Sequence, residues 1–252
     1  MLNEAIFDFF LSLNDFLSAA HKNLSVTYKF KDNPAVKDAI EALGIPHTEV
    51  DLIIVNDHAV DFFYKLNNHD RVKVHPVNAD SSLFKNHSLT PHYIYPLSFV
   101  VDVNLGKLAK ALRMLGFDTC YENHLPDKMI AALAAKENRI ALTRDVRLLN
   151  HKTIKWGYWI RSQKVKIQLQ EVAQRFQLLP YIVPFKRCIT CNGLIEPVTK
   201  ESVTEMLLPD TISFFNEFFQ CSFCRKVYWK GSHYENMLTW ISDLKAKLEK
   251  PD

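Results

Sequence analysis

Four cysteines near the C-terminal end form two Cys-x-x-Cys pairs, Cys188 with Cys191 and Cys221 with Cys224. Each such turn brings its two sulfur atoms to one point, and two turns supply the four soft thiolates that a structural zinc ion prefers. The 29 residues between the pairs exceed the usual ribbon spacing. We therefore predict a zinc ribbon with a hairpin or a helix inserted between its two cysteine pairs.

Two other interpretations of the cysteines stay open at this point. The pairs would form disulfides in an oxidising compartment, but nothing in the sequence indicates one. A redox-active pair is also conceivable, although neither pair opens an obvious thioredoxin-like helix. The fifth cysteine, Cys120, lies in an apolar stretch and is expected to be an inert core residue.

Length and hydropathy set the class of protein. The 252 residues, 48% of them hydrophobic, are enough for two compact domains and a small metal-bound module. No apolar run approaches the length of a membrane span, and the N-terminal residues lack the pattern of a signal peptide. We expect a cytoplasmic protein that does not bind membranes.

Charge is distributed unevenly along the chain. Residues 1–98 carry 8 Lys/Arg against 12 Asp/Glu, whereas residues 99–252 carry 23 against 16. An acidic first part is therefore joined to a basic remainder. Basic surface favours a polyanionic partner such as RNA, although many solvated faces are also basic.

The first part of the chain has the element order of a β-grasp, or ubiquitin-like, domain. Strand-like alternation is found over residues 5–10, 24–30 and 71–75, and a buried strand over 51–55. A helix opens at Pro34 and stops at Gly44. We assign residues 1–78 to this domain and the polar residues 79–96, with Pro91 and Pro96, to a linker.

The second part alternates strands with helices, which predicts a parallel α/β sheet. Strands are expected over residues 99–102, 118–121 and 139–143, and helices over 105–115 and 127–137. Residues 97–183 would form this α/β domain. The α/β domain would also contain a further helix over 168–176. Residues 184–252 would form the ribbon and a terminal helix over 235–248.

Three aspartates follow this alternation. Asp102 and Asp145 come at the ends of strands, and Asp127 begins a helix. The active sites of parallel α/β sheets lie at the carboxyl ends of their strands, and carboxylates gathered there bind Mg²⁺ or Mn²⁺. Each also has a structural interpretation, because Asp127 and Asp145 suit helix caps and Asp102 needs a partner after a buried strand.

Several segments resemble the Mut-seven C-terminal RNase family, a PIN-like nuclease fold fused to a zinc ribbon. They are residues 100–118 around Val-Val-Asp, Leu142-Thr-Arg-Asp145, Arg187-Cys-Ile-Thr-Cys-Asn-Gly193 and Tyr228-Trp-Lys-Gly-Ser-His233. The match covers about residues 97–240 in the correct order. Residues 5–77 resemble the ubiquitin-like domain often found in front of it.

The resemblance implies roles for particular residues. Asp102, Asp127 and Asp145 would form the acidic site that holds Mg²⁺ or Mn²⁺. Glu122 is a candidate for the fourth acidic residue that such sites often have, but the sequence does not place it in the site. The four paired cysteines would bind zinc.

Basic and aromatic residues supply further candidates for RNA contacts. Lys107, Lys110 and Arg113 share one helix, and Arg144 adjoins Asp145; all could meet phosphates, although a solvated face is the more common role. Trp156, Tyr158 and Trp159 lie near Arg161, Lys164 and Lys166 in sequence. Base stacking is one interpretation of these rings, and core packing is the more common one.

The sequence is compatible with three alternative functions. The leading prediction is a metal-dependent ribonuclease, since no Ser–His or Cys–His arrangement for a protein nucleophile is evident. The alternative is a non-catalytic RNA-binding or adaptor protein with a structural zinc ribbon. The third is a scaffold whose ubiquitin-like domain binds a protein partner.

Overall fold

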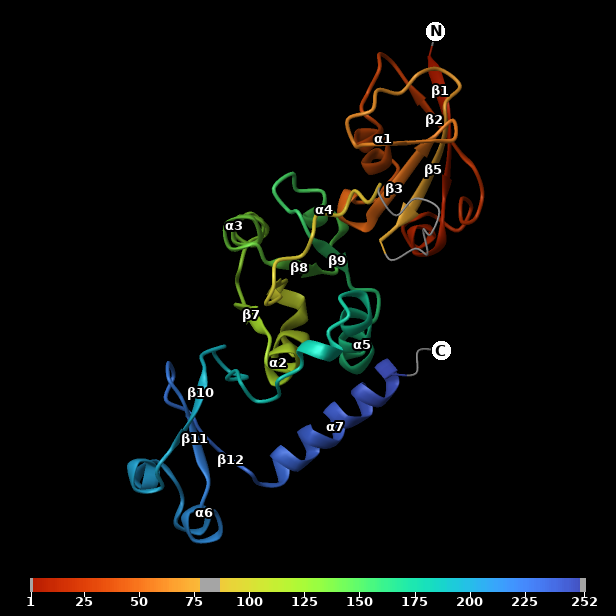
Figure 1. Ribbon diagram of the computed structural model, residues 1–252. Helices are drawn as coiled ribbons and strands as arrows, with labels where there is room; N and C mark the ends of the chain where they lie inside the picture. Colours follow the sequence, from red (N-terminus) through yellow and green to blue (C-terminus); the bar gives the residue numbers. More distant parts are fainter. Residues whose placement is uncertain (1, 78–86, 250–252) are drawn as a thin grey trace. The chain divides into compact units, whose positions relative to one another are not determined.

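The computed structural model describes residues 2–77 and 87–249, and three β-sheets are found there. Their strand orders are β2-β1-β5-β3-β4, β7-β6-β8-β9 and β10-β11-β12. The ribbon in Figure 1 follows these elements in chain order. The α/β alternation and the N-terminal β-grasp order expected from the sequence are both confirmed.

The five-stranded sheet forms the β-grasp domain. Its two central strands, β1 and β5, run parallel, with Phe7 paired to Val72, and the other pairs are antiparallel. Buried residues alternate with partly exposed ones along β1, because one face of the sheet meets the core and the other does not. The strands are β1 (Asn3–Phe9), β2 (Val26–Phe30), β3 (Val50–Val55), β4 (His58–Val60) and β5 (Arg71–Pro76).

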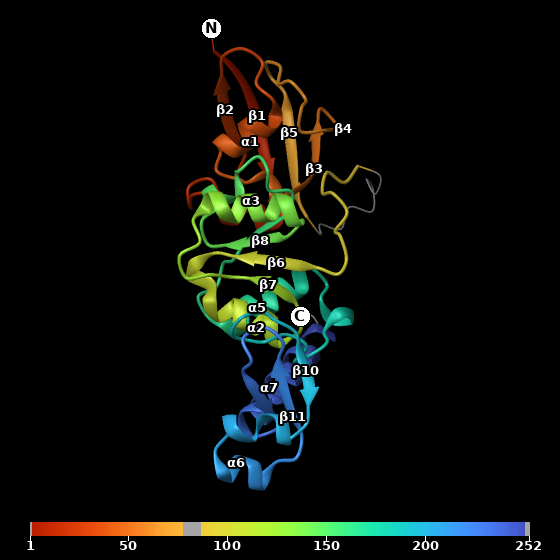
Figure 2. The same cartoon turned by 90° about the vertical axis from the view of Figure 1, so that its left-hand side faces the viewer.

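One short helix, α1 (Val36–Ala42), packs on this sheet, as Figures 1 and 2 show. Val36, Ala39 and Ile40 have no exposed surface and join the strand residues in one hydrophobic core. Gly44 follows the helix with φ of 96°, a backbone conformation that glycine adopts without strain. The helix therefore ends where the sequence predicts.

Strand β4 is not apparent from the sequence. Asn56 and Asp57 both have positive φ, 48° and 68°, and they reverse the chain so that Val55 pairs with His58. This backbone is that of a tight hairpin turn. Only three residues follow it as a strand, which is too short to show an alternating pattern.

The parallel sheet contains four short strands, β6 (Ser98–Val101), β7 (Asp118–Cys120), β8 (Ile140–Thr143) and β9 (Gly157–Trp159). β6 pairs in parallel with β7, and β8 pairs in parallel with β9. Both β6 and β8 are almost wholly buried, as strands of parallel sheets usually are. The helices that connect and follow them are α2 (Gly106–Met114), α3 (Asp127–Glu137), α4 (Val146–Leu149) and α5 (Val165–Arg175).

Two compact units can be distinguished. The first contains Met1–Ile94 with Pro126–Trp159, and the second contains Tyr95–Leu125 with Ile160–Asp252. This grouping follows spatial contacts and does not follow the chain order of the predicted domains. The first unit thus combines the β-grasp domain with α3, β8 and β9.

Side chains of the β-grasp domain contact β9 within the first unit. The backbone N–H of Trp159 donates a hydrogen bond of 2.8 Å to the carboxylate of Glu49, which is 2% exposed. The ring of Phe16 lies 4.8 Å from that of Trp159, and Nε2 of His47 donates to the carbonyl oxygen of Ile154. The β-grasp domain is therefore bound to this part of the chain by part-buried hydrogen bonds and a ring contact.

The described end of the predicted linker is also held in place. Asp51 accepts hydrogen bonds from the Ser88 hydroxyl and the Thr90 N–H, and the Trp156 indole donates to the carbonyl oxygen of Pro91. Residues 78–86 lie outside the described residues, so the rest of the linker prediction stays untested.

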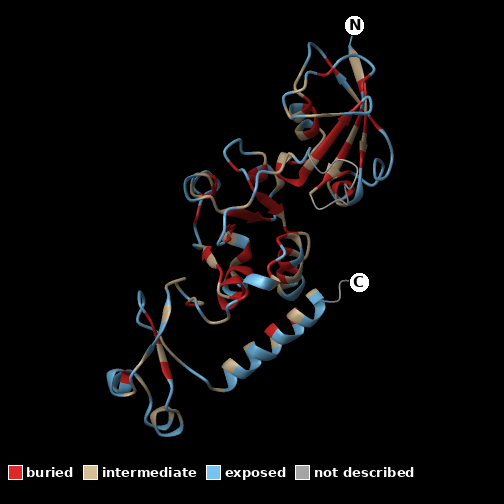
Figure 3. Cartoon of the chain, viewed as in Figure 1, coloured by how far each residue is buried: buried red, intermediate tan, exposed pale blue. Residues whose placement is uncertain are grey.

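The second unit ends in the ribbon and one long helix. The antiparallel strands β10 (Ile195–Val198), β11 (Phe218–Cys221) and β12 (Val227–Trp229) form the ribbon, and α6 (Pro209–Phe214) lies between the first two. The insertion expected between the cysteine pairs is therefore helical. Helix α7 (Ser232–Glu249) is mostly exposed, with Ile241 and Leu244 buried (Figure 3).

Candidate functional site

The first cysteine pair is shaped by local backbone bonds. Cys188 N–H donates to the carbonyl oxygen of Gly193 at 2.8 Å, and Asn192 N–H donates to that of Cys188 at 2.8 Å. Asn192 has φ of 72°, which asparagine tolerates better than most residues. A Cβ atom on Gly193 would lie 2.8 Å from the sulfur of Cys221, so this position admits only glycine without a shift.

The second pair repeats this geometry at the end of β11. Cys221 N–H donates to the carbonyl oxygen of Lys226 at 3.0 Å, and Arg225 N–H donates to that of Cys221 at 3.1 Å. Arg225, like Asn192, directly follows the second cysteine of its pair and has positive φ, 60°. The two turns are therefore alike in backbone conformation.

The four sulfur atoms converge. All lie within 4.8 Å of one another, and two sulfur–sulfur distances are 3.6 Å (Cys188 to Cys224) and 3.4 Å (Cys191 to Cys221). Tetrahedral zinc with Zn–S bonds of about 2.3 Å needs sulfur atoms about 3.8 Å apart. Both measured sulfur–sulfur distances are well above the about 2.05 Å of a disulfide bond, so the disulfide interpretation is not supported. The cluster fits a metal ion such as zinc.

The environment of Cys188 favours its thiolate. Burial opposes ionisation, but hydrogen bonds from the Tyr228 hydroxyl and from the backbone near Cys191 outweigh it and lower the pKa of Cys188 to about 6. Burial raises the pKa of Cys224 to about 12, and side-chain hydrogen bonds with the other three cysteines of the cluster act in the same direction. A cation among the sulfur atoms would reverse this second effect, since metal binding requires deprotonated cysteines.

Arg113 and Asp118 connect the α/β part of the second unit to the first cysteine turn. Arg113 is 3% exposed and donates to the carbonyl oxygens of Thr119 and Thr190 at 3.0 and 2.9 Å. Asp118 accepts from the amide of Asn192 and from the guanidinium of Arg187. The prediction that Arg113 contacts RNA phosphates is corrected, because its guanidinium is buried and bonded to the cysteine turn.

Asp102 lies immediately after β6 in the second unit. Its side chain is buried, 5% exposed, and caps the 3₁₀ turn of residues 103–105 by accepting from the N–H of Asn104 at 3.4 Å. A carboxylate with so little access to water needs compensating charge or hydrogen bonds. Its placement agrees with the sequence prediction, which expected a charge directly after this buried strand.

Asp145 and Asp127 are exposed residues of the first unit. Asp145 follows β8 and caps α4, since its carboxylate accepts from the N–H of Arg147 at 2.8 Å. Asp127 is the first residue of α3, whose cap position is Pro126. The expectation that Asp127 caps this helix is therefore wrong by one residue. Glu122 is exposed in the loop after β7.

Other predicted residues have mixed outcomes. Trp156 and Tyr158 are 5% and 8% exposed, which supports core packing over base stacking. Arg144 is exposed, and its carbonyl oxygen accepts from the Trp159 indole. Cys120 is half-buried rather than fully enclosed. Lys107 and Lys110 are exposed and line a cavity of the second unit.

Three further lysines lie near that cavity; two of them were noted in the sequence beside the aromatic residues 156–159, and the third was given no role. Lys164, Lys166 and Lys247 line it too, although they come from two helices far apart in the sequence. The sequence places Lys164 and Lys166 near Trp156, but no periodicity relates them to Lys107 or to α7. Only the folded chain brings them to one cavity.

The fold and the cysteine cluster together define a parallel α/β domain with a ribbon that can hold a metal, preceded by a β-grasp domain. Family models match both parts: the Mut7-C RNAse domain at residues 97–241 and the Mut7-C ubiquitin domain at residues 2–82. The first match covers more than half of the chain, which therefore belongs to the Mut7-C RNAse domain family. The resemblance found in the sequence is confirmed.

Other comparisons add no relative. No curated protein and no solved structure matches the chain. Among the described residues, no helix is both long and apolar enough to cross a membrane.

Proposed function

We propose that this protein is a metal-dependent ribonuclease in which Asp102, Asp127 and Asp145 hold Mg²⁺ or Mn²⁺. One observation carries the proposal: the Asp102 carboxylate is 5% exposed at the carboxyl end of a buried parallel strand. Ligands of α/β folds bind at this end of the strands. The family assignment supports hydrolysis of RNA.

The chemistry of the three side chains fits such a cation. Carboxylate oxygens are hard ligands, which Mg²⁺ and Mn²⁺ prefer. Asp102 follows β6, Asp145 follows β8, and Asp127 is the first residue of the helix after β7. Asp102 and Asp145 thus lie just beyond the carboxyl ends of parallel strands, and Asp127 begins the helix that follows a third, which supports a shared role.

The protein's own groups would position the reaction. Hydrogen bonds from Asn104 N–H to Asp102 and from Arg147 N–H to Asp145 would hold the two carboxylates in place. A bound divalent cation would supply a water of lowered pKa and would stabilise charge on the scissile phosphate. Such hydrolysis leaves a 3′-hydroxyl and a 5′-phosphate.

The remaining parts have supporting roles in this proposal. Zinc bound by the four cysteines would be structural, because all four ligand positions are filled by protein sulfur atoms. The β-grasp domain would serve as a docking domain for a protein partner. The proposed location is cytoplasmic, in keeping with four cysteines arranged as metal ligands and not as disulfides.

The test is cleavage of a mixed RNA pool by metal-depleted protein, with and without added Mn²⁺. We expect cleavage only with the metal and its loss in Asp102→Asn. Asp210→Asn, which changes an exposed carboxylate in the first turn of α6, is the matched control and should cleave normally. Zinc content must be measured in every sample, so that loss of the ribbon metal is not mistaken for loss of the catalytic one.

A negative result has a definite meaning. RNA binding without metal-dependent cleavage, in protein that retains its zinc, would replace the enzyme with a non-catalytic RNA-binding adaptor. Cleavage that persists in Asp102→Asn, after exclusion of contaminating nuclease, would locate the active site elsewhere.

A further inference from the structure

A cavity of about 1010 Å³ in the second unit lies beside the first turns of α2 and α5. One wall comes from Asn104, Leu105 and Gly106 at the start of α2. The opposite wall comes from residues 163–168 at the start of α5, and Lys247 of α7 completes the lining. Neither helix has an acidic residue in its first turn.

The charge of this cavity is of one sign. Five lysines line it, and no aspartate or glutamate does so among the described residues. All five are exposed, and within the described chain none of them forms an ion pair with a carboxylate. We call this cavity the lysine groove; its lysines are Lys107, Lys110, Lys164, Lys166 and Lys247.

Five unpaired ammonium groups around one cavity repel one another, and a polyanion relieves that repulsion. Lys107 and Lys110 lie on α2, and Lys164 and Lys166 at the start of α5. The charges therefore line both sides of the cavity. This arrangement suits a chain of phosphates better than a single small anion.

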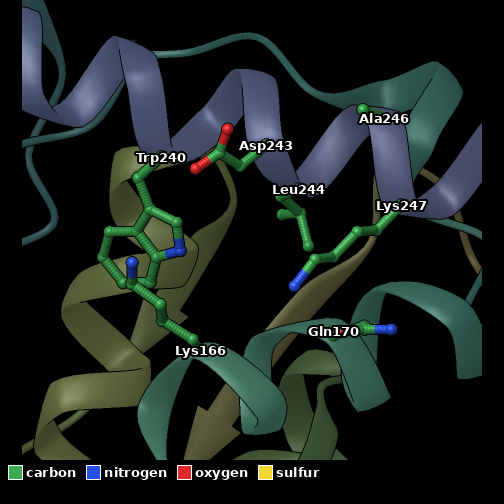
Figure 4. A pocket seen from close by; sticks show the side chains of 7 residues that line it. All are labelled: Lys166, Gln170, Trp240, Asp243, Leu244, Ala246 and Lys247. Carbon is green, nitrogen blue, oxygen red and sulfur yellow. The ribbon is translucent and has the colours of Figure 1, made fainter.

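A second cavity, of about 400 Å³, adjoins the groove between α5 and α7. Lys166 and Lys247 line both cavities, so the two are neighbours. Figure 4 shows the Trp240 indole extending from α7 and the Lys166 side chain directed toward it. Among the described residues that line this second cavity, two are lysines and only Asp243 carries a carboxylate.

Trp240 is half-buried, and one part of its ring system lines this second cavity. An indole next to lysines offers a flat surface on which an unpaired base can stack while the ammonium groups meet the adjacent phosphates. A base that is paired within a duplex cannot use such a surface. The combination of lysines and an indole thus favours a single strand.

The groove also lies next to the proposed catalytic residue. Asn104 and Gly106 line it, and the carboxylate of Asp102 caps the turn that contains Asn104. A strand bound in the groove would therefore pass close to Asp102 within the same unit.

We propose that the lysine groove binds single-stranded RNA, with the five lysines on its phosphates and Trp240 stacked on one base. The statement that the bound RNA is the protein's substrate rests on the proposed ribonuclease function. The groove itself needs no Mg²⁺ or Mn²⁺, so binding can be tested separately from cleavage.

The test measures the affinity of the full chain for a fluorescent single-stranded RNA of mixed sequence, without added divalent cations. In Lys164→Ala/Lys166→Ala we expect weaker binding and a plot of log K against log salt that is shallower by about 1.4. Lys29→Ala/Lys31→Ala is the matched control, since it removes two exposed lysines of β2 and the following turn. It should bind like the unaltered chain.

The stacking step has its own variants. Trp240→Leu should weaken binding of the single strand about tenfold, and Trp240→Phe by less, because phenylalanine keeps a ring face. Melting curves of both variants check that α7 stays folded. Equal or tighter binding of a fully paired RNA duplex would overturn the single-strand assignment.

The outcomes separate this inference from the proposed function. If the groove variants bind RNA like the control, the groove is not the binding site, whatever the protein cleaves. If they lose RNA binding while the unaltered chain cleaves nothing, the groove stands and the ribonuclease proposal fails. Binding of an acidic peptide with the affinity found for RNA would also overturn the inference.

Discussion

The guanidinium of Arg113, on helix α2, donates a hydrogen bond of 2.9 Å to the carbonyl oxygen of Thr190, which lies between Cys188 and Cys191. A second nitrogen of the same group donates to Thr119 at the middle of β7. Burial lowers the pKa of Arg113, although the nearby thiols and Asp118 oppose this effect. One buried cation therefore joins a helix, a strand and the cysteine turn.

Replacement of Arg113 by methionine should destabilise the protein. The substitution leaves the carbonyl oxygens of Thr119 and Thr190 without their donor, at a cost of about 2–4 kcal/mol in the free energy of unfolding. Urea denaturation measures this change. Lys110→Met on the exposed face of the same helix is the control and should alter stability little. Unchanged stability together with weaker RNA binding would restore Arg113 as a phosphate contact.

The cysteine cluster should hold one zinc ion per chain. Cys191→Ser replaces a thiolate ligand with a hydroxyl, so we expect loss of zinc and unfolding of the ribbon, since zinc binding contributes directly to the folding of such modules. Elemental analysis and circular dichroism give the two readouts. Cys120→Ser changes a cysteine outside the cluster and should keep its zinc. An absence of zinc from freshly purified, reduced protein would refute the assignment.

The variant Asp102→Asn should lose RNA cleavage and keep its fold. Asparagine retains the oxygen that accepts the hydrogen bond from Asn104 N–H, so the turn stays capped. The negative charge that a cation needs is lost, and so is any repulsion from neighbouring carboxylates. We expect a melting temperature that is unchanged or raised, measured by calorimetry beside the cleavage assay. A large fall in melting temperature would instead assign Asp102 a structural role.

Limited proteolysis should cut the chain first between residues 78 and 86. That segment is polar, and the residues that follow it are bonded to Asp51 and Trp156. Because Glu49, Phe16 and His47 contact residues 154–159, the two fragments should stay together on a sizing column under native conditions. Early cleavage within residues 100–150 would count against the domain boundaries. Separation of the fragments would show that these contacts are weak.

The sequence predicts best what is encoded by local spacing. Each cysteine pair is a single turn, so its geometry follows from four neighbouring residues. The same holds for α1, whose apolar residues repeat with the helical period and which stops before Gly44. Strand β9 was missed because its Tyr158 and Trp159 were interpreted through their rings, as stacking or core-packing residues, and not as part of a short strand.

The contacts that a side chain makes could not be predicted from local spacing in the sequence. Residues 107 and 113 are six positions apart, which places them about 120° apart around a helix with 3.6 residues per turn. Lys107 is therefore exposed while Arg113 is buried. Equal spacing of three basic residues does not reveal which one meets the core. The lysine groove depends on two helices and α7, whose meeting no local pattern encodes.

The contact between Glu49 and Trp159 bears on how the Mut7-C RNAse domain can be prepared alone. β9 is the last strand in its sheet order, and Glu49 satisfies one of its outward N–H groups. A shortened chain that starts at residue 97 would lack Glu49 and leave that strand able to pair with another molecule, as unprotected edge strands do. The β-grasp domain would therefore protect this edge strand from pairing between molecules. Its removal would lower the solubility of the shortened chain even if the residues of the proposed active site were unchanged.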